Sequence, residues 1–189
     1  MPNLGVVIAS VRERRAGAAV ADWFVALARR HAGFQVDVLD LQTVGLPVLE
    51  EPEHPRLRKY RSEKTKSWSA RVAAMDAFVF VTPEYNYSSP PALVNALDHL
   101  YVEWNYKPVG FVSYGGISGG LRGVQMTKQI VTSFKMVPMT EQVALPFFTK
   151  MMDAVAGTFN GGEVNEKAAA SMLDELVRWT IALKVLRTG

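Results

Sequence analysis

The chain has 189 residues, of which 49% are hydrophobic and 21% charged, and its net charge is +3. These values are typical of one globular domain with its own core, and we expect a single domain over residues 1–189. The absence of cysteine excludes disulfides, thiolate metal sites and cysteine catalysis. The three histidines, His31, His54 and His99, lack the spacing of metal ligands, so we expect no bound metal.

Neither a membrane nor a nucleic acid is an expected partner. No apolar run approaches the roughly 18–20 residues that span a membrane, and the N-terminus MPNLGVVIAS lacks the regions of a signal peptide. We therefore expect a cytoplasmic protein. The pI is near 9.2, and the most compact basic run is RERR, residues 12–15. A cluster this small favours a small phosphorylated ligand over nucleic acid, which usually needs a broader basic face.

The first part of the chain predicts a strand, a helix and a second strand. Residues 4–9, LGVVIA, form a short apolar run that is typical of a strand buried on both faces. In residues 15–31 apolar side chains recur at helical spacing, and Gly33 ends that helix. Residues 34–41, FQVDVLDL, alternate valine with aspartate and predict a less buried edge strand.

The middle of the chain predicts a long loop followed by alternating helices and strands. Residues 42–63 contain Gly45 and three prolines, and loops of this length are often functional. The elements that follow are a helix over 64–75, a strand over 77–82, a helix from about Pro91, a strand over 107–114, a glycine-rich turn over 115–120 and a helix over 121–134.

The last part of the chain offers a short strand in residues 136–139 and 143–148, with an irregular extension, and then a helix from about Asn165. Strands that alternate with helices predict parallel strands joined by right-handed crossovers on both faces of a sheet. Five strands in a chain of this length predict an α/β three-layer sandwich with a five-stranded parallel sheet in the flavodoxin-like order 2-1-3-4-5.

Three loops at strand ends predict one binding site. They are residues 10–17 after the first strand, 83–89 after the third and 113–120 after the fourth. In the predicted order these three strands are neighbours, and ligands of open parallel sheets bind beyond the carboxyl ends of the strands. We therefore expect the three loops to line the same site.

The first of these loops, SVRERRAG, suits a terminal phosphate. The N-terminus of the following helix offers free N–H groups, and Ser10 adds a hydroxyl. Arg12 and Arg15 can each bind phosphate oxygens with two N–H groups, and Gly17 lets the backbone approach closely. The alternative is a solvated basic loop before a helix. The loop matches neither the dinucleotide pattern G-x-G-x-x-G nor the P-loop.

The third loop contains GISGG, residues 116–120, which matches the G-x-S-x-G pattern of a hydrolase nucleophile. In such hydrolases the histidine follows the serine along the chain, whereas all three histidines here precede Ser118. The order of residues therefore disfavours a hydrolase. We interpret the run as backbone N–H groups that can approach a planar ligand.

Four motifs in this order resemble the NADPH-dependent FMN reductases, which are flavodoxin-like flavoproteins. The motifs are S-x-R-x-x-R-x-G after the first strand, TPEYN after the third, NALDHL on the next helix and KPVGFVSYGG at the fourth strand. The resemblance covers residues 6 to about 146. The chain departs from the family at Ala9, where glycine is frequent, and at Glu13 and Arg14, where a Pro-Gly pair is frequent.

The resemblance implies which residues bind FMN. The implied phosphate ligands are Ser10, Arg12, Arg15 and Gly17. The residues implied beside the isoalloxazine ring are Pro83, Glu84, Tyr85 and Asn86, with Tyr87 nearby, and those at its pyrimidine edge are Ser113, Tyr114, Gly115 and Gly116. Tyr85 and Tyr87 have a simpler alternative interpretation as loop aromatics that cover the core.

The implied activity is that of an FMN-dependent NAD(P)H oxidoreductase that passes hydride from NADPH or NADH through bound FMN to an acceptor. Free flavin, a quinone, an azo compound or a metal oxyanion are the expected acceptor classes. Because the flavin carries the chemistry, we expect no catalytic side chain. The alternative is a flavodoxin-type electron carrier that does not oxidise NAD(P)H itself. A third possibility is an interaction protein that keeps the fold without a flavin.

The region after the helix at Pro91 suggests self-association. His99, Tyr101, Trp104 and Tyr106 lie close together in the sequence, and large exposed aromatic side chains mark partner surfaces. The resemblance also implies a homodimer or homotetramer. The alternative is that these aromatic side chains pack within the subunit.

Overall fold

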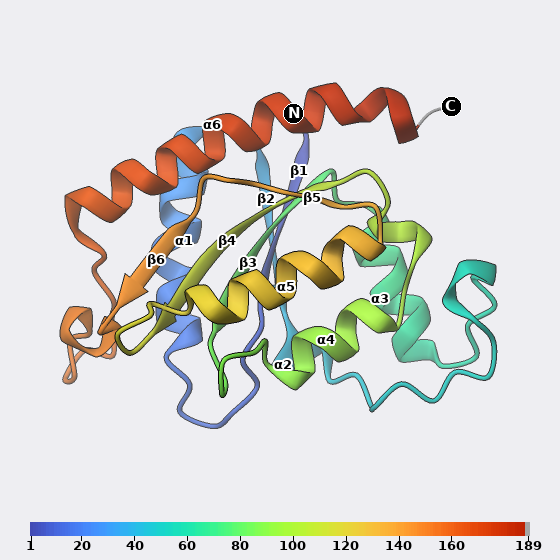
Figure 1. The fold of residues 1–189 in the computed structure, drawn as a ribbon, viewed down its shortest axis with the longest axis horizontal. Helices are drawn as coiled ribbons and strands as arrows, with labels where there is room; N and C mark the ends of the chain where they lie inside the picture. Colours follow the sequence, from blue (N-terminus) through green and yellow to red (C-terminus); the bar gives the residue numbers. More distant parts are fainter. Residues whose placement is uncertain (188–189) are drawn as a thin grey trace.

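The computed structural model describes residues 1–187, which form a three-layer α/β sandwich (Figure 1). The middle layer is a parallel sheet in the predicted order β2-β1-β3-β4-β5, and β6 also pairs with β4. The strands are β1 (Asn3–Ile8), β2 (Gln35–Asp40), β3 (Ala77–Pro83), β4 (Pro108–Gly115), β5 (Val137–Pro138) and β6 (Val143–Pro146).

The fifth position of the sheet is shared by two short strands, where the sequence predicted one strand with an irregular extension. β5 pairs with Pro108 and Val109 at the start of β4, and β6 pairs with residues 112–115 at its end. The N–H groups of Val137 and Met139 donate to the carbonyls of Lys107 and Val109 at 3.1 and 2.9 Å, so the nitrogen of Pro138 faces away from β4, at the open edge of the sheet where proline is tolerated. Pairing with β4 resumes at Val143, and within residues 1–187 the sheet has six strands in five positions.

In the described residues 1–187, six α-helices cover the two faces of the sheet (Figure 1). They are α1 (Gly17–His31), α2 (Leu41–Val44), α3 (Glu63–Ala73), α4 (Pro91–Asp98), α5 (Leu121–Ser133) and α6 (Gly162–Arg187), and the short 3-10 turns are η1 (Pro55–Leu57), η2 (Val102–Trp104) and η3 (Phe148–Met151). α2 occupies the start of the predicted loop over 42–63, and α6 begins three residues before the predicted Asn165. In the described part of the chain no helix is long and apolar enough to cross a bilayer.

β1, β3 and β4 are buried on both faces, as their continuous apolar sequences predicted, whereas β2 is partly exposed, as its alternating sequence predicted. In β1, Leu4, Val6 and Ile8 pack with α1 and α6, whereas Val7 and Ala9 belong to the core beneath α3, α4 and α5. Successive side chains of a strand point to opposite faces, so one apolar run supplies both cores. Each fully buried side chain of this size contributes about 1.5–3 kcal/mol of transfer free energy.

Polar side chains hold the long excursion between α2 and α3 in place. The side-chain amide of Asn95 accepts a hydrogen bond from the N–H of Leu49 at 2.9 Å and donates to the carbonyl of Pro47 at 2.7 Å. The carboxylate of Glu51 accepts the N–H groups of Arg61 and Ser62 at 2.7 and 2.9 Å. The excursion is therefore an ordered cover beside α4.

The prediction of an exposed aromatic surface after α4 is wrong. His99 and Trp104 are each only 1% exposed, and Trp104 packs edge-on against Trp68, Phe78 and Phe80. Tyr101 packs against Phe134, with ring centroids 5.8 Å apart. Because α4 ends at Asp98, the residues that follow fold back over the sheet and their aromatic side chains fill the core.

Candidate functional site

The three predicted loops meet at the carboxyl ends of β1, β3 and β4 and enclose a cavity of about 460 Å³. A volume of this size is within the range of cofactor pockets. The residues that line it are Ser10, Arg12, Glu13, Arg14, Arg15, Ala16, Pro83, Glu84, Tyr85, Tyr114, Gly115, Gly116 and Phe148. The convergence follows from the strand order, because β3 lies between β1 and β4.

The first loop presents positive charge to one end of the cavity. Within the described residues neither Arg12 nor Arg14 has an ion-pair partner, and no side chain caps the N-terminus of α1 at Ala16. Uncapped helix N–H groups and guanidinium groups are the donors that bind phosphate. Arg14 adopts a left-handed conformation, with φ of 52°. This is the position where the resembling family often has glycine, which adopts that conformation at no steric cost.

Arg15 is held in the cavity wall by Asp40, a residue that the sequence analysis did not select. Two of the guanidinium nitrogens lie 2.6 and 2.5 Å from the two carboxylate oxygens of Asp40, and Arg15 also donates to the carbonyl of Ser10. Burial acts to raise the pKa of Asp40, but the hydrogen bonds from Arg15 and from the backbone of Gln42, together with the charge of Arg15, hold the pKa below its ordinary value. Asp40 ends the edge strand β2, so only the pairing of β2 with β1 reveals this contact.

Gly17 is the point of closest contact between the first loop and β4. A Cβ atom at this position would lie 2.4 Å from Oγ of Ser10 and 2.5 Å from the hydroxyl of Tyr114. The Tyr114 hydroxyl itself donates to Oγ of Ser10 at 3.2 Å, and burial raises the pKa of Tyr114 to about 12. Gly17 therefore allows Ser10 and Tyr114 to approach, which brings the first and third loops together.

The second loop is a tight hairpin at the end of β3. Tyr85 and Ser88 exchange both backbone hydrogen bonds at 3.0 Å, and Asn86 and Tyr87 between them have φ of 50° and 67°. Two successive left-handed residues form a type I′ turn, for which asparagine is favoured at the first position. The hairpin places Tyr85 in the cavity wall and leaves Tyr87 64% exposed at the tip.

Glu84 fastens the second loop to the third. Its carboxylate accepts hydrogen bonds from Oγ of Ser118 at 2.9 Å and from the N–H and guanidinium of Arg122 at 3.1 and 2.7 Å. Burial acts to raise the pKa of Glu84, but the hydrogen bonds from Arg122 and Ser118 hold it below its ordinary value. The same guanidinium lies 3.9 Å from the ring centre of Tyr87, so Arg122 supports the hairpin as well.

The glycine-rich loop after β4 contains a serine that ties it to Glu84, and glycines in conformations that a residue with a side chain would not fit. The hydroxyl of Ser118 donates to Glu84, and no histidine is among the hydrogen-bond partners of this serine. Gly120 has φ of 86°, and a Cβ atom there would lie 2.9 Å from the backbone N of Tyr114. The hydroxyl of Ser113 donates to the carbonyl of Gly119 at 2.8 Å and closes the turn. The loop therefore leaves its backbone open to close approach by a ligand. Ser118 does not form the nucleophile elbow of a hydrolase.

Nine of the thirteen predicted site residues line the cavity. The other four lie in the same predicted loops but outside the lining, and they are Gly17, Asn86, Tyr87 and Ser113. Phe148 lines the cavity without having been predicted, and it packs edge-on against Tyr114 with ring centroids 5.0 Å apart. It lies in η3, beyond β6, and no motif marked it. The predicted contacts of these residues with FMN stay predictions.

Comparisons with known proteins identify the family. The family described as NADPH-dependent FMN reductase matches residues 2–150 of the chain, which include all three loops. The chain belongs to the NADPH-dependent FMN reductase family. FMN and NAD(P)H are therefore the flavin and the reductant of this family of enzymes, as the sequence motifs predicted.

Individual relatives agree with this assignment. An NAD(P)H-dependent FMN reductase of Schizosaccharomyces pombe is 43% identical over 121 residues, which cover 63% of this chain and 60% of that protein. A second NAD(P)H-dependent FMN reductase, from a Nectria species, is 32% identical over 83% of this chain and 84% of its own length. Among solved structures, the flavoenzyme NAD(P)H:(acceptor) oxidoreductase FerB from Paracoccus denitrificans superposes with a TM-score of 0.76 at 20% identity, over 96% of this chain and 98% of FerB. The last similarity supports the fold.

Proposed function

We propose that the chain is an FMN-dependent NAD(P)H oxidoreductase that reduces a small acceptor such as free flavin, a quinone, an azo compound or a metal oxyanion. The observation that carries the proposal is the convergence of three loops on one cavity, with guanidinium groups at one end and backbone glycines at the other. The bound FMN would supply the chemistry by taking two electrons from NAD(P)H and delivering them to the acceptor.

The donors that line the cavity fit the two ends of FMN. Arg12, Arg14 and the uncapped N-terminus of α1 provide positive charge for a phosphate dianion, and the hydroxyl of Ser10 lies beside them. Gly115 and Gly116 provide a wall without side chains, and a Cβ atom at Gly116 would meet nothing within 4 Å. A planar ring can therefore approach the peptide groups of the third loop.

In this proposal the side chains of the site bind and orient, and none transfers a proton. Asp40 would fix Arg15 at the phosphate end, and Glu84 with Arg122 would fix the distance between the second and third loops. Tyr114, whose hydroxyl stays protonated at neutral pH because burial raises its pKa to about 12, would separate the phosphate end from the core. Pro83 and Tyr85 would cover the ring.

Anaerobic reduction tests the activity directly. The purified protein is reconstituted with FMN and mixed with NADPH or NADH, and the absorbance of the oxidised flavin is followed by stopped flow. We expect bleaching by at least one nucleotide and recovery when an acceptor is added. A bound flavin that neither nucleotide bleaches would support the electron-carrier alternative. A protein that does not bind FMN, and whose melting temperature FMN does not raise, would contradict the proposal as a whole.

Arg12→Ala and Arg15→Ala test the position of the phosphate. Each substitution removes a charge-assisted contact worth on the order of 1.5–3 kcal/mol, which weakens FMN binding by roughly ten- to a hundred-fold. Arg15→Ala should have the larger effect because it also leaves the Asp40 carboxylate unpaired beside the phosphate. Arg30→Ala removes an equal charge from an exposed position in the last turn of α1 and serves as the control. Unchanged FMN affinity in both cavity variants would show that the phosphate lies elsewhere.

Self-association to a homodimer or homotetramer is part of the proposal. Two exposed apolar side chains, Ile117 and Phe147, flank Gly116 at the mouth of the cavity and are 78% and 48% exposed. A second copy of the chain would cover them and narrow the entrance. Light scattering should show a multimer for the wild-type protein and a smaller particle for Ile117→Glu. A monomeric wild-type protein would remove this part of the proposal and leave the flavin site unaffected.

A further inference from the structure

A second cavity, of about 450 Å³, lies at the opposite end of the sheet, at the amino ends of β3 and β4. It is lined by the end of α3 and the residue before β3, by the segment between α4 and β4, and by the end of α6. The lining residues are Arg58, Ala73, Met75, Asp76, Val102, Glu103, Asn105, Tyr106, Lys107, Lys184, Leu186 and Arg187.

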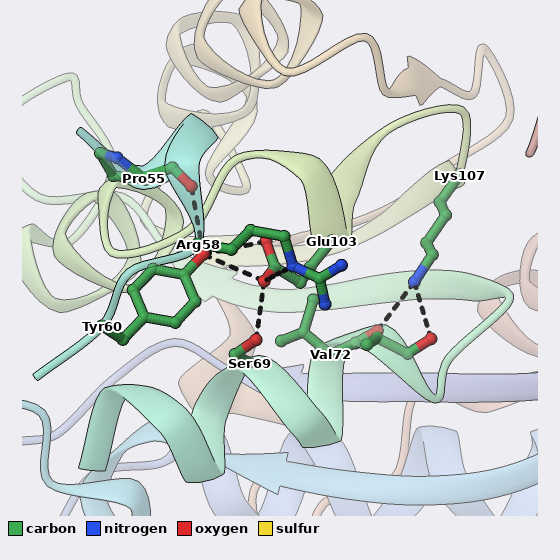
Figure 2. A network of polar contacts seen from close by, with 8 residues as sticks. Pro55, Arg58, Tyr60, Ser69, Val72, Glu103 and Lys107 are labelled. Carbon is green, nitrogen blue, oxygen red and sulfur yellow. Dashed lines mark hydrogen bonds and ion pairs between the residues drawn. The ribbon is translucent and has the colours of Figure 1, made fainter. Parts of the chain in front are cut away.

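Lys107 is the buried cation of this cavity. The residue is 5% exposed, and its Nζ donates to the carbonyl oxygens of Val72 and Ala73 at 2.8 and 3.3 Å, in the last turn of α3. Figure 2 shows the lysine side chain reaching these two oxygens apart from the carboxylate of Glu103. An ammonium group has three N–H donors, and two are used. No carboxylate in residues 1–187 lies within ion-pair distance of this Nζ.

The two carboxylates of the cavity are already engaged. Glu103 accepts hydrogen bonds from Ser69 at 2.6 Å, from Tyr60 at 3.0 Å and from Arg58 at 3.3 Å (Figure 2). Asp76 accepts the N–H of Asn3 at 2.9 Å and pairs with Arg187 at 3.3 Å. Neither carboxylate can move to Lys107 without breaking these contacts.

Lys107 is therefore left without a carboxylate partner among the described residues that line the cavity. Arg58 pairs with Glu103 and Arg187 pairs with Asp76, so neither carboxylate is available to the lysine. Burial lowers the pKa of Lys107 to about 7, and the nearby Arg187 lowers it further, while Asp76 and Glu103 oppose the shift. A buried cation without a counterion is costly, and a bound anion would reduce that cost. The walls near the lysine are apolar at Met75, Val102 and Leu186.

We propose that this cavity binds a small organic anion, a carboxylate or a phosphate monoester with an apolar body, and that Lys107 at its floor is the charge partner. The free N–H of Lys107 would donate to the anionic group, the guanidinium of Arg187 would face it from α6, and Met75 and Leu186 would contact the apolar body. The site is separate from the flavin cavity, since the two lie at opposite ends of the sheet.

Calorimetric titration of the FMN-saturated protein tests the proposal. The probes are phenyl phosphate and benzoate, which distinguish the two anionic groups, and inorganic phosphate, which lacks the apolar body. We expect saturable binding of at least one aromatic probe and weaker binding of inorganic phosphate. Saturation with FMN keeps the probes from the flavin cavity. Absence of binding by both aromatic probes would overturn the proposal.

Lys107→Met identifies the charge partner. We expect it to weaken binding of the aromatic probe by about tenfold or more, as expected for a lost charge-assisted hydrogen bond. Lys167→Met removes the same charge from an exposed ion pair on α6 and should leave binding unchanged. Equal probe affinity for the wild-type protein and Lys107→Met would overturn the assignment.

A blocking variant keeps the test decisive if Lys107→Met does not fold. Ala73 is exposed at the end of α3 and lines the cavity, so Ala73→Trp would fill the space without disturbing the core. We expect loss of probe binding with an unchanged circular dichroism spectrum and unchanged FMN affinity. Retained probe binding in Ala73→Trp would place the anion outside this cavity.

Discussion

A buried carboxylate lies at each end of the sheet, and the two carboxylates connect different parts of the fold. Glu84, beyond β3, contacts Ser118 of the glycine-rich turn and Arg122 at the start of α5, and its side chain is 7% exposed. Glu103, before β4, contacts Ser69, Tyr60 and Arg58, and its side chain is 1% exposed. Both have a serine and an arginine as partners.

The difference lies in what each carboxylate connects. Glu103 joins α3 to the segment after α4. If it is removed, Ser69 loses its acceptor and Tyr60 keeps only the longer hydrogen bond to the carbonyl of Pro55 at 3.4 Å. Burial, reinforced by Glu103, raises the pKa of the Tyr60 hydroxyl, which therefore stays a donor at neutral pH. Glu84 joins two loops whose arginine is half exposed to water. We therefore expect the Glu103 contacts to contribute mainly to stability, and the Glu84 contacts mainly to the relative position of two loops that line the first cavity.

The largest expected effect follows from removal of the Glu103 carboxylate. Glu103→Ala should lower the free energy of unfolding by about 3 kcal/mol, because buried hydroxyl donors and an arginine lose their partner. Urea denaturation measures the change. Glu163→Ala, at an exposed ion pair on α6, is the control and should change little. A loss for Glu103→Ala as small as that of the control would contradict the contrast between the two ends.

The pH dependence of stability should reveal Lys107. Its pKa in the folded protein is about 7, below the ordinary value of 10.5, so the unfolded chain binds more protons between these values. Stability should therefore rise with pH above about 7, by up to about 1.4 kcal/mol per pH unit. The groups that face the ammonium are Arg187, Asp76 and Glu103.

The measurement is the difference in unfolding free energy between the wild-type protein and Lys107→Met from pH 6 to pH 9, a range chosen around that pKa. This difference should increase with pH, because the variant has no group that must lose its proton on folding. A flat difference would show that Lys107 keeps its ordinary pKa, and that the amino end already contains its counterion.

Glu84→Gln should have a smaller effect at neutral pH, about 1 kcal/mol, since water can replace part of the lost contact with Arg122. The folded-state pKa of Glu84 is lowered, so its contribution to stability is present above about 4.5 and is lost as pH falls below that value. The variant should therefore lose less stability on acidification than the wild-type protein. We expect the free energy of FMN binding to change more than the free energy of unfolding. A larger change in the free energy of unfolding would show that Glu84 acts mainly to stabilise the fold.

The smallest expected effect concerns the hairpin tip. Tyr87→Gly and Tyr87→Ala both remove the ring that lies against Arg122, but only glycine adopts the φ of 67° without strain. The glycine variant should be more stable than the alanine variant by about 1 kcal/mol in thermal unfolding. Equal stability would show that the hairpin changes conformation when the ring is lost.

The sequence by itself determined the strand order and the position of the cavity between the three loops. Apolar runs in residues 4–9 and 77–82 marked buried strands, and the loops after them had to meet at one edge because parallel strands end together. The first and third loops were found from residue types that bind phosphate or allow close backbone approach. The local sequence pattern is sufficient to predict these features, because they depend on residues that are neighbours in the chain.

Only the tertiary structure decided which side chains contact the charged and aromatic groups. Asp40 beside Arg15, Arg122 beside Glu84 and Phe148 beside Tyr114 are contacts between residues from separate elements. Trp104 was expected at the surface, but the chain turns back after Asp98 and buries it against Trp68. The surroundings of Lys107, which has no carboxylate within ion-pair distance in residues 1–187, also depend on where α3 and α6 lie. Such contacts depend on how the elements pack, and they cannot be predicted from the spacing of residues along the chain.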